Sequence, residues 1–409
     1  MNYVIIGNGP AAVTAAETIR KADGEGNITL FSKEDEFTYS RPLISYLLCG
    51  KTDETKMRYK APDFYEKNRI DFLKGVEAVA IDSEKKTVTG SNGQIVPYDA
   101  LLLATGARPF VPPIEGIDTI KYHSFMTLAD AKSLESCLTK NTRVLIVGAG
   151  LIGMKCLEGI RDHVASVTVC DLAKQVLPSI LDEEAATMVQ KHCEEKDVTF
   201  LLGDSAVRFE PGKAIMKSGK EVEFDELVMA VGVRPATELA QSLGLDASRG
   251  IHTNAYGETD IPGIYAAGDC AKSIDLTTDT ERVLALLPNA TQQGEICGMA
   301  MAGRTPKQMK AIPMNAMGMF GLHMITAGTM TGESYIIREN GSYKRLCTKD
   351  DRLMGYIMLG DVERAGIYTA LIREKTPLSS IDFQLMLEKP QLMAFSRRDR
   401  AMLMGGSRL

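Results

Sequence analysis

The sequence lacks paired cysteines. No Cys-x-x-Cys motif occurs among its eight cysteines, which are scattered along the 409 residues. They stand at positions 49, 137, 156, 170, 193, 270, 297 and 347. Scattered single cysteines are typical of reduced thiols, rather than of a disulfide framework or a zinc site. The sequence therefore argues against chemistry that needs a redox-active cysteine pair.

The sequence also lacks a basic excess and a long apolar run. Its 47 Lys and Arg against 53 Asp and Glu give a net charge of −6, which leaves no surplus to neutralise phosphates. We therefore expect no nucleic-acid partner, and no membrane, since the apolar runs are too short to span a bilayer. Residues 1–7 lead directly into an expected strand, so we expect no signal peptide and a cytoplasmic protein.

Residues 1–31 predict a strand, a glycine turn, a helix and a second strand. The apolar run 3–6 is typical of a strand in a parallel sheet, and residues 11–22 and 27–31 give the helix and the next strand. The turn reads Gly7-x-Gly9-Pro10-Ala11-Ala12. Gly7 permits the tight turn, Gly9 lets backbone N–H groups approach a pyrophosphate, and Ala12 allows close packing.

A second unit of the same form begins near residue 143. Residues 143–147 predict a strand, residues 154–162 a helix and residues 166–171 a further strand. The turn between the first strand and the helix reads Gly148-x-Gly150-Leu151-Ile152-Gly153. All three glycines of a dinucleotide fingerprint are present, so this turn is expected to bind a second pyrophosphate.

An acidic residue ends this second unit and predicts its nucleotide. Asp171 stands 23 residues after Gly148, where a carboxylate accepts the ribose hydroxyls of NAD and repels the 2′-phosphate of NADP. No arginine follows it immediately. The sequence therefore predicts NADH in preference to NADPH.

Three further segments connect the two units. Residues 99–106 predict a buried strand that ends in Ala104-Thr105-Gly106, and residues 230–235, around Gly232, repeat the form of 104–109. Residues 107–117 and 233–236 are the expected crossovers between domains. Residues 259–269 end in Gly268 and Asp269, whose carboxylate is suited to accept hydrogen bonds from a hydroxyl chain.

Taken together and in this order, the segments resemble the FAD-dependent pyridine nucleotide-disulfide oxidoreductase superfamily over residues 1–310. The resemblance implies that the turn at Gly7 binds FAD and that Asp269 binds its ribityl chain. It further implies that residues 104–106 lie against FAD, and that a short strand at residues 75–79, including Val76, meets the adenine.

The segment 39–45 narrows the resemblance. Its Arg41-Pro42 pair is similar to that of NADH:rubredoxin oxidoreductases, the flavin domain of NADH-dependent nitrite reductases and oxygenase-coupled ferredoxin reductases. In these relatives the arginine contacts the FAD pyrophosphate, a charge match that suits Arg41. Residues 150–155 and 287–294 also resemble this branch, which implies that Pro288 and Asn289 lie near the flavin ring.

Two positions depart from the pattern of these relatives. Several relatives carry the ribose carboxylate where this chain has Lys33, so Glu34 is the nearest acid, and a solvated loop role for it stays open. Tyr46 replaces a lysine of the ferredoxin-reductase branch. Both departures concern individual FAD contacts and not FAD binding itself.

No catalytic side chain or metal site is assigned. Pro42 stands where single-cysteine relatives carry their cysteine, and Cys49 is favoured as a buried helix cysteine. Lys155 is a weak candidate that faces either the domain junction or solvent. The histidines show no spacing typical of metal ligands. They stand at positions 123, 163, 192, 252 and 323.

The expected fold is α/β, with two doubly wound, Rossmann-like domains of the glutathione-reductase type and a C-terminal α+β domain. Residues 1–109 and 238–309 are expected to bind FAD, and residues 110–237 to bind NAD. Residues 310–409 form the third domain, with strands at 342–348 and 352–359 and a helix at 365–375.

The leading expectation for function is hydride transfer from NADH to FAD, followed by electron transfer to a small redox protein. Rubredoxin or a ferredoxin-like iron–sulfur protein fits this role, and the flow can run in either direction. Two alternatives stay open: an NADH oxidase or peroxidase that uses Cys49, and a redox-sensing flavoprotein that acts through partner binding. A monomer and a homodimer are both compatible with the sequence.

Overall fold

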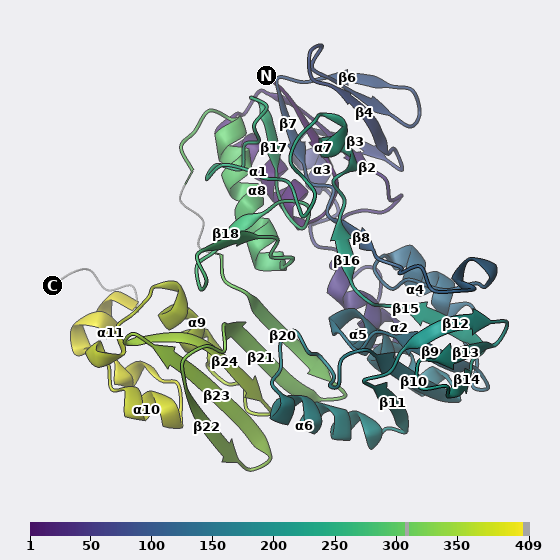
Figure 1. The fold of residues 1–409 in the computed structure, drawn as a ribbon. Helices are drawn as coiled ribbons and strands as arrows, with labels where there is room; N and C mark the ends of the chain where they lie inside the picture. Colours follow the sequence, from purple (N-terminus) through teal and green to yellow (C-terminus); the bar gives the residue numbers. More distant parts are fainter. Residues whose placement is uncertain (307–310, 404–409) are drawn as a thin grey trace.

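A computed structural model describes residues 1–306 and 311–403, which form three lobes (Figure 1). The first lobe contains helices α1 (Pro10–Ala22) and α8 (Leu287–Met301). The second contains the sheet next to α5 (Leu151–Ile160), and the third is the C-terminal sheet with its helices. Within the described ranges, no helix is both long and apolar enough to cross a bilayer.

The first lobe is built on a parallel sheet of five strands, in the order β17-β7-β1-β2-β3. The strands are β1 (Asn2–Ile6), β2 (Asn27–Ser32), β3 (Ile70–Lys74), β7 (Ala100–Leu103) and β17 (Ile264–Ala266). Every residue of β7 is buried, as expected for a strand covered on both faces. A smaller antiparallel sheet contains β4 (Ala78–Asp82), β5 (Thr87–Gly90) and β6 (Ile95–Pro97). Between β2 and β3 lie the 3-10 turn Arg41–Leu43, α2 (Ile44–Leu48) and α3 (Phe64–Lys67).

The second lobe repeats this plan with a parallel sheet in the order β11-β10-β9-β15. Its strands are β9 (Arg143–Val147), β10 (Ser166–Asp171), β11 (Val198–Leu202) and β15 (Glu226–Met229). Helices α4 (Leu128–Glu135), α5 and α6 (Glu183–Glu194) accompany it. Its small antiparallel sheet contains β12 (Ala206–Glu210), β13 (Lys213–Met216) and β14 (Glu221–Glu223).

Two antiparallel strands connect the first and second lobes. They are β8 (Ala107–Pro109) and β16 (Val233–Pro235), the two segments predicted as crossovers, and they run side by side between the lobes (Figure 1). After β16 the chain returns to the first lobe through α7 (Glu238–Ser242). The hairpin of β18 (Ser273–Asp275) and β19 (Thr280–Arg282) then precedes α8.

The third lobe is an antiparallel sheet in the order β20-β21-β24-β23-β22, with helices after it in the chain. Its strands are β20 (Met314–Met319), β21 (Leu322–Gly328), β22 (Glu333–Glu339), β23 (Ser342–Lys349) and β24 (Arg352–Leu359). Its helices are α9 (Ala365–Arg373), α10 (Phe383–Glu388) and α11 (Arg397–Leu403). The α+β character expected for this region is therefore confirmed.

One buried apolar cluster joins all three lobes. It includes Ile44 and Leu48 of α2, Met154 and Leu157 of α5, and Met324 of β21. Apolar surface shared in this way fixes the lobes against one another. The helix α2, although it belongs to the N-terminal part of the chain, therefore packs on the second lobe.

Most of the predicted elements are confirmed, and two expectations need correction. The helix expected at residues 154–162 begins earlier, at Leu151, because Gly150 is already its N-cap. The strand expected at residues 75–79 is wrong for residues 75–77, which turn the chain between β3 and β4. Gly75 adopts a φ of +72° there. The domain limits stay a prediction, and the boundary between residues 309 and 310 lies outside the described residues.

Candidate functional site

The carboxyl ends of the parallel strands of the first lobe meet at one edge. Gly7 follows β1, and Ala104 follows the neighbouring strand β7. Gly7 has a φ of +121°, and a Cβ atom there would collide with the carbonyl of Ala104. Glycine is therefore required both for the turn and for the close approach of the two backbones. The loop after β17 brings Gly268 and Asp269 to the same edge.

Helix α1 begins at this edge without a side-chain cap. Gly9 is its N-cap, Pro10 occupies the first turn, and no side chain accepts from the first N–H groups. An uncapped helix N-terminus preceded by glycine is suited to an anionic phosphate. Ala11 and Ala12 in the first turn are buried, which brings the helix close to its neighbours.

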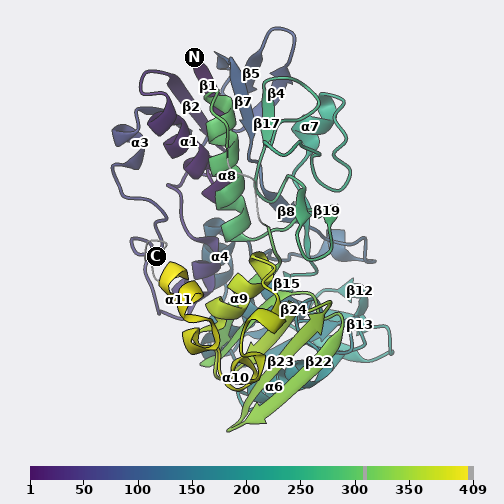
Figure 2. The same cartoon turned by 90° about the vertical axis from the view of Figure 1, so that its left-hand side faces the viewer.

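Helix α8 packs closely on α1 along two glycines (Figure 2). A Cβ atom at Gly294 would collide with the carbonyl of Ala11, and one at Gly298 would lie 2.8 Å from the carbonyl of Ala15. The Gly294-x-x-x-Gly298 spacing repeats once per helical turn, so it was visible in the sequence as a packing signal. It was not among the predicted site residues, although it positions Pro288 and Asn289 at the start of α8.

Two polar side chains at this edge lack protein partners. The Nδ2 atom of Asn289 is buried and has no hydrogen-bond partner. Asp269 is half-buried, and no hydrogen bond or ion pair to its carboxylate occurs among the described residues. Burial raises its pKa, and the nearby charge of Arg41 acts in the opposite direction. A buried polar group without a partner is costly, so these two residues fit a site whose partner is a polar ligand such as the hydroxyl chain of FAD.

Arg41 and Glu34 are paired with each other. The Arg41 guanidinium contacts the Glu34 carboxylate and donates to the carbonyl of Met126 at 3.1 Å. The other oxygen of Glu34 accepts from the Tyr39 hydroxyl at 2.6 Å. Burial raises the pKa of that hydroxyl. The predicted ribose acid and the predicted pyrophosphate cation therefore form one network, about half-exposed, beside Asp269.

Other predicted flavin contacts have structural partners. Lys33 is exposed and its Nζ lies 3.0 Å from Glu77. The Thr105 hydroxyl donates to the carbonyl of Ala236 at 2.5 Å, so it joins the turn after β7 to the returning crossover. Gly106 has a φ of +71° in the same turn. Val76 is half-buried in the turn between β3 and β4, and Pro42 lies in the 3-10 turn before α2.

The glycine turn of the second lobe has the same close approaches. Gly148 has a φ of +116°, and a Cβ atom there would collide with the carbonyl of Ala230 at the end of β15. A Cβ atom at Gly153 would collide with the carbonyl of Gly148 itself. Gly150 is the N-cap of α5 with no side-chain cap, and Leu151 and Ile152 form its first turn. Gly232, with a φ of +124°, completes the turn after β15.

Asp171 lies across this turn. One of its oxygens accepts from the N–H of Ala149 at 2.7 Å, and the other accepts from the N–H of Ala173 at 2.8 Å. Each carboxylate oxygen can accept a further hydrogen bond. The geometry therefore places a fixed negative charge at the end of β10, where the sequence predicted the ribose of a nicotinamide nucleotide.

A buried carboxylate joins α5 to the other two lobes. Glu158 is 3% exposed, lies 3.4 Å from the Lys51 Nζ and accepts from the N–H of Phe320 at 3.0 Å. Lys155, one turn earlier, contacts Glu158 and donates to the carbonyl of Gly318 at 3.3 Å. Burial opposes the charge of Lys51, but Glu158 outweighs it and raises the pKa of this ammonium group. Lys155 therefore does face the lobe junction.

Sequence reasoning missed Lys51 and Glu158. The spacing of Lys155 and Glu158 indicated one helix face, but nothing in the sequence connected this face with Lys51. The Lys155 ammonium also lies 4.3 Å from the centre of the Tyr46 ring, a cation–π contact. Cys49 ends α2 nearby, half-buried, and its thiol lies 3.6 Å from the Tyr46 carbonyl.

Two family models match the chain. The model described as pyridine nucleotide-disulphide oxidoreductase matches residues 1–294. The model described as the rubredoxin NAD+ reductase C-terminal domain matches residues 313–376, which include the sheet of the third lobe and α9. Residues 377–403, with α10 and α11, lie beyond this match.

Individual proteins are similar over most of the chain. The NADH-dependent phenylglyoxylate dehydrogenase subunit epsilon of Aromatoleum evansii is 31% identical over 392 residues, with 93% of each chain covered. An NADH oxidase of Methanocaldococcus jannaschii is 34% identical over 315 residues, covering 74% of this chain and 70% of that protein. The covalent putidaredoxin reductase–putidaredoxin complex superimposes with a TM-score of 0.85 at 24% identity, covering 99% and 98%, which shows the same fold.

Proposed function

The chain belongs to the pyridine nucleotide-disulphide oxidoreductase family and is an FAD-dependent oxidoreductase of nicotinamide nucleotides; from this premise we propose that it uses NADH and exchanges electrons with a small rubredoxin-like or iron–sulfur protein. When bound, FAD would supply the chemistry of accepting a hydride from the nicotinamide and of releasing electrons singly or in pairs. The chain supplies binding, orientation and electrostatics. Arg41, Asp269 and Asn289 are the residues proposed to bind FAD.

The observation that carries the proposal is the state of the cysteines. All eight are free, and six of them are buried. Because the sequence has no Cys-x-x-Cys pair to serve as an internal acceptor, we infer that electrons pass directly to an acceptor outside the chain. The match of residues 313–376 to a rubredoxin reductase C-terminal domain supports a small redox protein as that acceptor.

The choice of NADH is supported by Asp171. Its carboxylate is held by two backbone N–H groups at the end of β10, so its charge cannot turn away from a 2′-phosphate without losing both hydrogen bonds. The similarity to a protein named NADH-dependent over 93% of both chains supports the same choice. That protein is a dehydrogenase subunit, which supports a partner that belongs to a larger enzyme and electron flow toward NAD.

The proposal is tested by stopped-flow oxidation of the NADH-reduced holoenzyme under anaerobic conditions. The acceptors are rubredoxin, a [2Fe–2S] ferredoxin, oxygen, hydrogen peroxide and a small disulfide. We expect fast reoxidation by the first two and slow reoxidation by the others. Fastest reoxidation by oxygen or peroxide would contradict it, as would a colourless protein that FAD cannot reconstitute. Mixing reduced ferredoxin with the oxidised holoenzyme and NAD measures the opposite direction.

A second candidate is an NADH oxidase or peroxidase, favoured by the similarity to the archaeal NADH oxidase. It requires a peroxide-reducing thiol, and the candidate is Cys49, which is half-buried at the end of α2. Hydrogen peroxide would oxidise this thiol to a sulfenic acid with release of water, and two electrons from NADH with two protons would return it to the thiol with release of a second water. The Cys49→Ser variant separates the two functions. Unchanged NADH turnover with oxygen and peroxide excludes the thiol mechanism, whereas loss of peroxide turnover with intact ferredoxin reduction supports it.

A further inference from the structure

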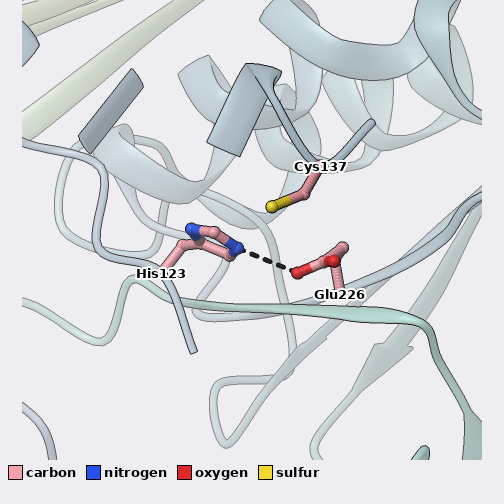
Figure 3. Close-up of side chains that lie close together, drawn as sticks. All are labelled: His123, Cys137 and Glu226. Atoms are coloured by element: carbon pink, nitrogen blue, oxygen red, sulfur yellow. Dashed lines mark hydrogen bonds and ion pairs between the residues drawn. The ribbon is translucent and has the colours of Figure 1, made fainter. Parts of the chain in front are cut away.

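Three side chains capable of binding a metal meet at the second lobe (Figure 3). The Nε2 atom of His123 lies 2.9 Å from an oxygen of Glu226, and the Cys137 thiol points toward both. One candidate ligand atom from each residue lies within 4.8 Å of the other two. Among residues 1–306 and 311–403, this is the one such group of three His, Cys, Asp or Glu side chains.

The backbone holds these three residues in place. The N–H of His123 donates to the carbonyl of Leu227 at 2.8 Å, and its carbonyl accepts from the N–H of Met229 at 2.8 Å. Glu226 is the first residue of β15, and Cys137 is the second residue after α4. The segment that bridges to β15 at His123, the turn after α4 and β15 itself therefore each contribute one side chain.

The three side chains lie away from the edge of the second-lobe sheet that carries the Gly148 turn. Glu226 begins β15, whereas Ala230, which contacts Gly148, follows the other end of this strand. The two sites therefore stand at opposite ends of the same sheet. The role inferred for the group is independent of the proposed electron-transfer function.

The chemistry of the three side chains selects a metal class. Sulfur and imidazole ligands favour zinc and similar transition metals, whereas calcium and magnesium favour oxygen alone. A thiolate and a carboxylate together balance the charge of a divalent ion. The His123 side chain is 3% exposed and that of Glu226 is 20% exposed, and the half-buried Cys137 leaves access from solvent. We propose that His123, Cys137 and Glu226 bind one divalent zinc-class ion, with water as the fourth ligand.

Lys121 is the charged group that this site must accommodate. Its ammonium lies 3.5 Å from the Cys137 sulfur. A metal-bound thiolate still accepts hydrogen bonds, and such partners orient the ligand. Since the two anionic ligands neutralise the metal charge, the ammonium meets little net repulsion.

Metal binding replaces the hydrogen bond between His123 and Glu226 with three bonds from the protein to the metal. The Cys137 thiol releases its proton to solvent as the sulfur–metal bond forms. The proton that the His123 Nε2 shares with Glu226 moves to Nδ1 of the ring, so that Nε2 and the carboxylate oxygen each form a metal bond. No electron is transferred. The ion then joins the segment at residue 123 and the turn after α4 to β15, so its effect is on the stability of the second lobe.

Cobalt(II) titration of the chelator-treated holoenzyme tests the proposal. We expect one cobalt per chain, a sulfur-to-cobalt charge-transfer band in the difference spectrum, and tetrahedral d–d bands at wavelengths beyond the flavin absorption. Zinc should abolish these bands by displacement and should raise the melting temperature. In Cys137→Ser the charge-transfer band and the zinc-dependent rise should both be lost.

His252→Gln is the matched control, because His252 forms a similar pair with Glu281 at 2.7 Å but belongs to no group of three potential metal ligands among the described residues. It should bind cobalt as the wild type does. Should Cys137→Ser not fold, Glu226→Gln and the wild-type spectrum decide. A wild type without the charge-transfer band, or a band that persists in Cys137→Ser, would overturn the proposal and leave an ordinary His–Glu pair.

Discussion

The Asp171 carboxylate accepts a hydrogen bond from the N–H of Ala149 in the glycine turn, so its position is fixed in the absence of a nucleotide. Two backbone N–H groups hold the two oxygens at 2.7 and 2.8 Å. A carboxylate fixed in this way is already oriented for the two ribose hydroxyls and repels a 2′-phosphate at the same position. We therefore expect the proposed discrimination between NADH and NADPH to depend on this one side chain more than on the shape of the turn.

We predict that Asp171→Ala reduces the preference for NADH. Loss of the hydrogen bonds should lower kcat/KM for NADH by about tenfold to a hundredfold, since each bond to a charged group is worth about 1.5–3 kcal/mol. The kcat/KM for NADPH should fall by a smaller factor or should rise. The control is Asp204→Ala in the adjacent loop, whose carboxylate bonds to Ser218 instead. An unchanged NADH to NADPH ratio in Asp171→Ala would contradict the assignment.

Asp269 illustrates a conflict between binding and stability. Burial raises its pKa, so the folded apoprotein binds this proton more tightly than the unfolded chain does. Stability of the apoprotein therefore declines as the pH rises from the unfolded pKa through the raised folded pKa, and the penalty is fully present above both values. A bound hydroxyl chain that donates to the carboxylate offsets this penalty.

We predict that Asp269→Asn raises the melting temperature of the apoprotein at neutral pH and weakens FAD binding. The loss of affinity should be about tenfold to a hundredfold, because a hydrogen bond to a charged acceptor becomes a neutral one. Thermal melting of the FAD-free protein and FAD titration measure the two effects. The exposed Asp260 gives the control variant Asp260→Asn, which should change neither. A destabilised apoprotein with unchanged FAD affinity would show that Asp269 is structural.

Helices α1 and α8 pack closely at the start of α1, next to the turn that is proposed to bind FAD. Gly294 and Gly298 allow the backbones of the two helices to approach closely, and the first turn of α1 carries the residues after Gly9. Close-packed backbones have no flexible side chain that can move aside. A single added methyl group at this contact must therefore displace a helix.

We predict that Gly294→Ala lowers both stability and FAD content. The new Cβ atom meets the carbonyl of Ala11, and overpacking of this kind costs about 1–3 kcal/mol. Urea unfolding and the ratio of flavin to protein absorbance are the measurements. The control is Gly366→Ala in α9, where no atom lies within 4 Å of the added Cβ. There the same substitution should stabilise by about 0.5–1 kcal/mol, because alanine favours helix. A neutral Gly294→Ala would mean that the helices separate without cost.

The sequence predicted what depends on local order along the chain. The strand–turn–helix units at Gly7 and Gly148 were predicted because their glycines, apolar runs and acids are close in sequence. The sequence did not predict the contact of Lys51 with Glu158, because these residues are far apart in the chain and meet only when the lobes pack together. The strand expected at residues 75–79 was wrong for residues 75–77, because Gly75 turns the chain there. The spacing of residues along the sequence does not reveal a site whose side chains come from several distant elements.

Two separated carboxylates of the second lobe, Glu158 and Asp182, accept hydrogen bonds from the third lobe. One is the buried Glu158 on α5, which accepts from Phe320 at the tip of the β20–β21 hairpin. The other is Asp182 before α6, which accepts from the Tyr343 hydroxyl at 2.6 Å and from Arg345 at 3.0 Å. Contacts at two distant points resist both rotation and separation. The sheet of the third lobe is therefore expected to move with the second lobe.

Asp182 also caps α6, through the N–H of Ala185 at 3.0 Å, so a test must separate the cap from the junction. Burial opposes the charge of Asp182, but its hydrogen bonds to Tyr343, Ala185 and Arg345 outweigh burial and lower its pKa. Its stabilising contribution is present above the unfolded pKa and is lost as the pH falls through the lowered folded value. Asp182→Asn keeps a good N-cap and removes the charge that Arg345 requires.

We predict that Asp182→Asn loosens the third lobe while the second lobe stays folded. Amide hydrogen exchange in β22 and β23 at neutral pH should accelerate by about tenfold, which corresponds to about 1.4 kcal/mol of lost protection. Exchange in β9 and β10 should not change. Glu184→Gln is the matched control, because its pair with Arg338 is exposed and worth at most about 1 kcal/mol. Equal acceleration in both variants, or acceleration that includes β9, would contradict a specific junction at Asp182. We expect Asp182→Asn to retain FAD, because the hydrogen bonds that it changes are those to Tyr343 and Arg345 of the third lobe.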